Sequence, residues 1–179
     1  MPQEPSINTL LQQAWDLRNA GNYAQASAVV QQAESYCAEE EYVLLGRIAH
    51  IYMQLEADHG RYEKAAKFSL QSIAYYQQAQ RPDLVAHATR HLADLQTNLG
   101  ELAAAVANYQ KAISIYREQA QSPPGNMANA LRAYAVLLEK MDQVKEAIPI
   151  WEQVKSMYTS LGLAAGIKEA EESLHRLKE

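Results

Sequence analysis

The sequence repeats a short turn motif four times at a nearly constant spacing. Two copies have the pattern Gly-x-Tyr-x-x-Ala, at residues 21–26 and 60–65, and two degenerate copies lie at residues 100–105 and 142–147. Successive copies are therefore 39, 40 and 42 residues apart. A fixed period of this length is typical of repeat proteins, in which each unit is one small supersecondary element stacked on the next.

Each unit is predicted to be a helix, a tight turn and a second helix. Glycine suits such a turn because it adopts the left-handed backbone conformation that ends many helices without strain from a β-carbon. Apolar residues between the motifs recur at helical spacing, as in Leu92, Leu95 and Leu99, and no segment alternates with the period of a strand. Two helices can approach closely at the small residue that ends each motif, which is Ala26, Ala65, Ala105 and Ala147.

Breaks between the units set the predicted boundaries. Proline- or glycine-containing segments at residues 81–83, 122–125 and 160–162 are predicted to be loops. We expect one domain with four repeats, at about residues 6–38, 41–79, 82–121 and 126–161, and a last helix at residues 163–178. That helix is predicted to cover the open end of the stack with an apolar stripe formed by Leu163, Ile167, Ala170, Leu174 and Leu177.

This pattern resembles the tetratricopeptide repeat (TPR) family over residues 6–161. The period exceeds the usual length of roughly 34 residues, as in the longer repeats of kinesin light chains. The resemblance implies an all-α chain, folded as an α-α superhelix of four helix-turn-helix repeats with a capping helix. The fourth turn departs from the pattern because it lacks a glycine. Pro149 also departs, since it falls inside a predicted helix, where proline usually kinks the chain.

The resemblance also implies that the first helix of each pair lines a concave groove. Positions thirteen and ten residues before each turn glycine, or its equivalent, are expected to face this groove, together with positions one or two helical turns further on. The predicted groove residues are Trp15, Arg18, Arg47, His50, His87, Arg90, Asp94, Asn98, Asn129 and Arg132. They include four of the eight arginines of the chain.

Two interpretations of the groove arginines are open. Arginine presents a planar fork that suits carboxylates, so the groove is predicted to bind an acidic or carboxylate-bearing peptide or segment of a partner protein. Alternatively, the arginines pair with nearby acids such as Asp58, Asp94 and Glu139 and hold adjacent repeats in register.

The histidines suggest a second class of function. His87 and His91 have the i,i+4 spacing of a helical metal-binding pair, and His50 is expected to face them from the previous repeat. The segment lacks the glutamate of a HExxH motif, and Arg90 between the two histidines disfavours a bound cation. We therefore expect no metal, no other cofactor and no catalytic residue. The alternative is a small metal-binding or hydrolytic protein that uses His50, His87, His91 and Asp94.

Charge and composition limit the classes of partner that the chain is expected to bind. The net charge of −5 gives no basic footprint for nucleic acid, and no run of about 18 apolar residues is present to span a membrane. Cys37 is the single cysteine and is predicted to be an inert, buried thiol. We do not expect residues 1–6 to form a secretory leader. We expect a cytoplasmic, non-catalytic interaction scaffold that is a monomer or a weak homo-oligomer.

Overall fold

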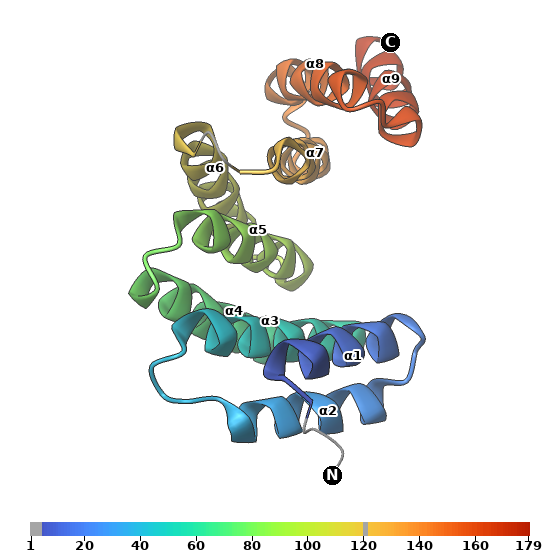
Figure 1. The fold of residues 1–179 in the computed structure, drawn as a ribbon. Helices are drawn as coiled ribbons and strands as arrows, with labels where there is room; N and C mark the ends of the chain where they lie inside the picture. The colour runs from blue at the N-terminus through green and yellow to red at the C-terminus, as the bar shows by residue number, and fades with distance from the viewer. Residues whose placement is uncertain (1–4, 120–121) are drawn as a thin grey trace.

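The chain folds into helices only, in a computed structural model that describes residues 5–119 and 122–179 (Figure 1). The all-α class is thereby confirmed for these residues. The predicted end of the third repeat at residue 121, and residues 1–4 of the segment that is not expected to be a leader, lie outside them. The nine helices of the described ranges are α1 (Ile7–Asn19), α2 (Tyr23–Tyr36), α3 (Tyr42–Asp58), α4 (Tyr62–Gln78), α5 (Pro82–Leu99), α6 (Leu102–Glu118), α7 (Pro124–Lys140), α8 (Val144–Ser160) and α9 (Ala164–Lys178).

The helices stack in the order of the sequence. Each packs against the next one along the chain, and α1 also contacts α3, as α5 does α7. The chain thus advances from α1 at one end to α9 at the other, with the two termini at opposite ends (Figure 1). This arrangement is the superhelical stack that the repeat pattern predicts. No described helix has the length and hydrophobicity needed to cross a membrane.

The turns adopt the backbone conformation expected of them. Gly21, Gly60 and Gly100 have φ angles of +77°, +70° and +79°. In the fourth turn Asp142 takes the same left-handed region at +59°, which aspartate tolerates better than most residues with a β-carbon. The motif alanines, at residues 26, 65, 105 and 147, all have 0% exposure. The turn residues and the motif alanines of the repeat therefore both have the local structure predicted for them.

Two prolines begin helices instead of separating them. Pro82 and Pro124 occupy the first turns of α5 and α7, where the missing N–H has no intrahelical partner to lose. The loop predicted at residues 122–125 is consequently shorter than expected, because Pro124 and Gly125 are helical. Helix α8 continues through Pro149 to Ser160.

The last helix covers one end of the core. Ala170 is fully buried, and Ile167, Leu174 and Leu177 pack against the cluster that contains Trp151. Leu163 is an exception to the predicted stripe: it precedes the helix and its side chain is 47% exposed. The apolar stripe of α9 is therefore one residue shorter than the sequence suggested.

Candidate functional site

A cavity of about 330 Å³ is lined by residues of α1, α3 and α5 and by Tyr76 of α4. We call it the α1–α3–α5 cavity. It brings together four of the predicted groove residues, Trp15, Arg47, His50 and His87. The rest of its lining is mainly apolar and consists of Leu11, Gln12, Ile51, Tyr76 and Leu84.

Some residues that line the cavity were not predicted from the sequence. Gln12 and Ile51 each follow a groove-facing position by one residue, so the face of the helix that borders the cavity is wider than the rule predicts. Tyr76 was not among the predicted groove residues. It is 3% exposed, and burial raises the pKa of its hydroxyl to about 12. Its position on α4, the helix that follows the one carrying His50, is the sequence feature that could have predicted its contact with the cavity.

Arg47 is the charged group of this cavity. Its Nη1 donates to Oδ1 of Asn8 at 2.5 Å. No carboxylate pairs with Arg47 in the part of the chain that the structure describes. The amide of Asn8 accepts a hydrogen bond without compensating the positive charge. Trp15 lies nearby with 37% of its side chain exposed, so the cavity offers an aromatic surface beside an uncompensated guanidinium.

Two other groove arginines have carboxylate partners on different helices. Arg18 of α1 donates twice to Asp58 of α3, at 2.6 and 2.8 Å. Arg132 of α7 donates twice to Glu169 of α9, at 2.6 and 2.5 Å. Asp58 is one of the acids expected to pair internally. Glu169 was not foreseen, and Glu139 instead accepts from Arg176 at 2.6 Å.

Arg90 belongs to a hydrogen-bonded network within the third repeat. It donates to Asp94 at 3.0 Å and contacts Nε2 of His91 at 2.5 Å. Asp94 also accepts from the hydroxyl of Tyr109 at 2.6 Å. Burial raises the pKa of the Asp94 carboxyl, but the hydrogen bond from His91 and the charge of Arg90 outweigh it and lower the pKa below its ordinary value.

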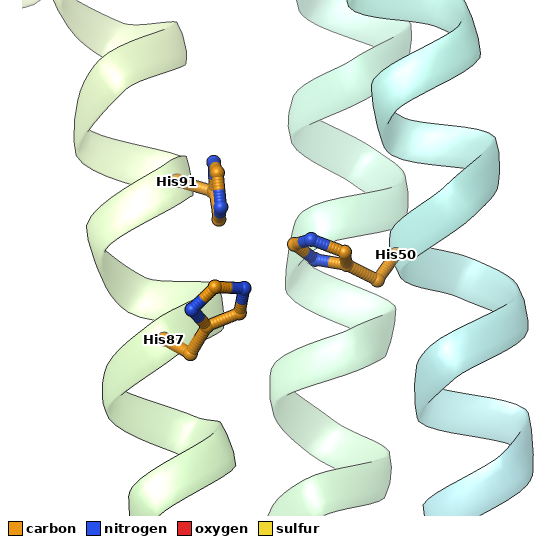
Figure 2. Close-up of side chains that lie close together, drawn as sticks. All are labelled: His50, His87 and His91. Atoms are coloured by element: carbon orange, nitrogen blue, oxygen red, sulfur yellow. The ribbon is translucent and has the colours of Figure 1, made fainter. Parts of the chain in front are cut away.

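Three imidazoles converge next to this network. We call His50 of α3 with His87 and His91 of α5 the histidine cluster, and its rings face one another across the two helices (Figure 2). The ring centroids are 5.0 Å apart for His50 and His87, 4.7 Å for His50 and His91, and 4.8 Å for His87 and His91. The sequence predicted both the pair on one helix and the approach of the third residue from the previous repeat.

Burial keeps the cluster uncharged. It holds the pKa of His50 well below its ordinary value, lowers that of His87 to about 3, and lowers that of His91 as well. Neighbouring positive charges add to this effect. Nδ1 of His50 is buried and has no hydrogen-bond partner within the described residues. At neutral pH the cluster therefore presents three neutral imidazoles.

The remaining groove residues lie away from the cavity. Asn98 donates to the backbone carbonyl of Asp94 in its own helix at 3.0 Å. Asn129 accepts from the hydroxyl of Tyr158 at 2.8 Å. Four of the ten predicted residues thus line the α1–α3–α5 cavity, and the others form the Arg18–Asp58 pair, the network around Arg90, a bond within α5, and contacts with the last helices. Their role in binding a ligand stays a prediction.

Cys37 differs from its predicted environment. It ends α2 and is half-buried instead of buried. Partial burial and the nearby carboxylates of Glu41 and Glu34 raise the pKa of the thiol. The residue is therefore a neutral thiol at physiological pH.

Comparison with solved structures defines the class of protein. The nearly identical TPR-like repeats of a Podosopora anserina protein superpose with a TM-score of 0.74 at 16% identity, covering 96% of this chain and 84% of that one. Aspartyl phosphate phosphatase F from Bacillus subtilis gives 0.83 at 11% identity, covering 92% and 43%. The yeast histone chaperone Hif1, described as a scaffold protein recruiting protein complexes to core histones, gives 0.68 at 12% identity, covering 97% and 95%.

These likenesses show the fold: the chain is a TPR-like helical-repeat protein, as the turn motifs predicted. A narrower assignment comes from the sequence. The family model of the soluble NSF attachment protein, SNAP, matches residues 53–168, which is more than half of the chain. The chain therefore belongs to the SNAP family. A comparison with curated proteins found no match.

Proposed function

We propose that this protein is a non-catalytic interaction module that binds an acidic or carboxylate-bearing segment of a partner protein at the α1–α3–α5 cavity. The observation that carries the proposal is Arg47, a groove arginine bonded to an amide while its counterparts are bonded to carboxylates. The family name, which refers to attachment to NSF, and the scaffold description of Hif1 support a protein partner.

The chemistry of the cavity suits one anchoring side chain or chain end. Arg47 can exchange the Asn8 amide for a carboxylate, and a desolvated bond of this kind contributes roughly 1.5–3 kcal/mol. Trp15, Ile51 and Leu84 supply apolar contact around it. Tryptophan and arginine are the residue types that most often dominate interface energies.

The same cavity is poorly equipped for hydrolysis. Its lining contains no carboxylate, serine or cysteine. Burial lowers the pKa of His87 to about 3, which makes this imidazole a weak base for proton transfer near neutral pH. These features favour binding over the hydrolytic alternative.

Peptide selection tests the proposal and requires no purified partner protein. Random peptides with free C-termini would be selected on the full chain, and their affinities measured for Arg47→Gln. Arg117→Gln is the matched control, because Arg117 is an exposed arginine of α6 that also donates to an amide oxygen, Oε1 of Gln153 at 3.5 Å.

We expect the selected peptides to require an Asp, a Glu or a free carboxylate at one position. Arg47→Gln should weaken their binding about 10–100-fold, by the free energy of one charged bond, while Arg117→Gln should not. Binding should also decline with added salt. Peptides that lack a required carboxylate, or that bind Arg47→Gln as tightly as the wild type, would contradict the proposal.

A further inference from the structure

The histidine cluster has the composition of a transition-metal site. One nitrogen from each of His50, His87 and His91 lies within 4.8 Å of the other two. In a tetrahedral site, metal–nitrogen distances of about 2.0–2.1 Å place the ligating nitrogens about 3.4 Å apart. The imidazoles therefore need to close in by less than about 1 Å each to bind one ion.

One ring nitrogen of the cluster lacks a hydrogen-bond partner in the part of the chain that the structure describes. This atom is Nδ1 of His50, which is buried. A buried polar atom of this kind requires an explanation, and coordination to an ion would supply its missing interaction.

The surroundings include a supporting carboxylate. Oδ2 of Asp94 lies 3.4 Å from Nδ1 of His91, and the carboxylate is itself held by the hydroxyl of Tyr109 at 2.6 Å. A carboxylate behind a ligating histidine orients the ring and raises its basicity in many metal sites. The third repeat thus supplies two ligands and the group that positions one of them.

The guanidinium of Arg90 opposes the binding of an ion at this site. Its guanidinium contacts Nε2 of His91 at 2.5 Å, so an ion must displace this contact to use that nitrogen. The charge of Arg90 is balanced by Asp94 and that of Arg18 by Asp58. Arg47, which lines the same cavity as His50 and His87, has no such acid among the described residues, so its charge opposes the ion together with the competition for one nitrogen.

From this geometry we propose that His50, His87 and His91 bind one divalent transition-metal ion, with Zn²⁺ as the ion expected. Three neutral imidazoles form a ligand set that also suits Co²⁺, Ni²⁺ and Cu²⁺. His50 and His87 line the α1–α3–α5 cavity, so a bound ion would lie beside that cavity. This site goes beyond the proposed peptide binding and does not use Arg47 as a ligand.

Titration of the full chain with metal alone tests the proposal. After treatment with a chelator, the protein would be titrated with Zn²⁺ by calorimetry and with Co²⁺ by visible absorption. We expect one ion per chain, and a Co²⁺ spectrum with the intense d–d bands of four-coordinate cobalt. Replacing any histidine of the cluster by Gln should weaken binding by more than about tenfold, while His59→Gln and His175→Gln should not change it.

The substitution Arg90→Gln tests the direction of the change in Zn²⁺ affinity. It removes the competing guanidinium and should tighten Zn²⁺ binding, whereas the affinity of a nonspecific surface site should stay the same. Nitrogen NMR of the wild-type histidine rings needs no variant and should show shifts at the three cluster residues alone. Failure to bind Zn²⁺ below millimolar concentration, or binding that His50→Gln leaves unchanged, would overturn the proposal and leave the peptide-binding function untouched.

Discussion

Gly46 of α3 packs so closely against the ring of Tyr76 of α4 that a β-carbon at residue 46 would overlap the ring. The hydroxyl of Ser72 donates to the Gly46 carbonyl at 2.9 Å beside this contact. The same relationship occurs between Gly166 and Tyr158 near the C-terminal end. Glycine is required at these helical positions by the close approach of two helices, whereas the turn glycines are required by their backbone angles.

Gly46→Ala should therefore destabilise the protein. The added methyl group forces Tyr76 out of its position, and overpacking of this kind costs about 1–3 kcal/mol. The free energy of unfolding, measured by urea denaturation at constant m-value, would report the loss.

Gly125→Ala is the control for this substitution. Gly125 is also helical, and a β-carbon there meets no atom within 4 Å. Alanine at such a site usually stabilises by about 0.4–1 kcal/mol through the unfolded state. Equal losses in the two variants would mean that helix geometry, and not the Tyr76 contact, sets the effect.

Ala105→Leu should also lower stability, by about 1–3 kcal/mol. Ala105 is fully buried in the cluster that includes Tyr109 and Leu137, which leaves no room for a larger side chain. Ala107→Leu, two residues later on the exposed face of α6, should change the unfolding free energy by less than about 0.5 kcal/mol. Thermal denaturation of both variants checks the difference, and similar melting temperatures would contradict the close-packing role of the motif alanine.

Much of the fold could be predicted because its markers are local. A turn glycine is needed for the left-handed conformation of its own backbone, and the motif alanine, such as Ala105, follows it at a fixed distance. Both residues can therefore be recognised within a single copy of the motif. Gly46 was not predicted, since its partner Tyr76 is thirty residues away in the sequence. Pro124 was predicted to lie in a loop because composition alone does not distinguish a loop proline from one in the first turn of a helix.

The site was predictable in part for a similar reason. The resemblance to TPR proteins implied that Arg47, His50 and His87 face one groove, and the structure brings them to one cavity. The bonds of Arg18 and Arg132 depend on which acid of another helix comes within reach. Asp58 is forty residues from Arg18, and Glu169 belongs to a helix that the repeat pattern does not include. The neutral state of the histidines depends on burial, which periodicity does not measure.

Stability should fall in acid through Glu56. A hydrogen bond from Arg61, with one from Lys64 at 2.8 Å, lowers the pKa of this carboxyl below its ordinary value despite partial burial. Because the folded-state pKa is depressed, the stabilisation is fully present above the unfolded pKa and is lost as pH falls through the folded one. The difference in unfolding free energy between wild type and Glu56→Gln should be largest near pH 7 and shrink below about pH 4.

Urea denaturation across this pH range measures that difference. Glu63→Gln, at an exposed position of α4, serves as the control and should show no such trend. A wild-type advantage over Glu56→Gln that persists unchanged in acid would show that the carboxylate charge contributes nothing.

Removal of residues 163–179 should cause association. Without α9 the cluster around Trp151 loses Ile167 and Leu174 as cover, and an exposed apolar end favours contact between chains. Light scattering should show a mass that rises with concentration. Leu174→Asp should reproduce part of the effect, whereas Leu163→Asp should not, because Leu163 is 47% exposed. A truncated chain that stays monomeric and equally stable would contradict the capping role.

The last prediction concerns Arg132 and Glu169, which join α7 to α9 through two hydrogen bonds. Both side chains are partly exposed, at 42% and 37%, so solvent screening keeps their coupling at or below about 1 kcal/mol. A double-mutant cycle of Arg132→Ala and Glu169→Ala measures this coupling as the departure from additivity. The exchanged pair, Arg132→Glu with Glu169→Arg, should recover part of the stability lost in each single reversal, because the opposite charges face each other again. Additive effects without recovery would mean that the pair does not hold the last helix, and Arg132 would then be available to a carboxylate of the partner, as the sequence first suggested.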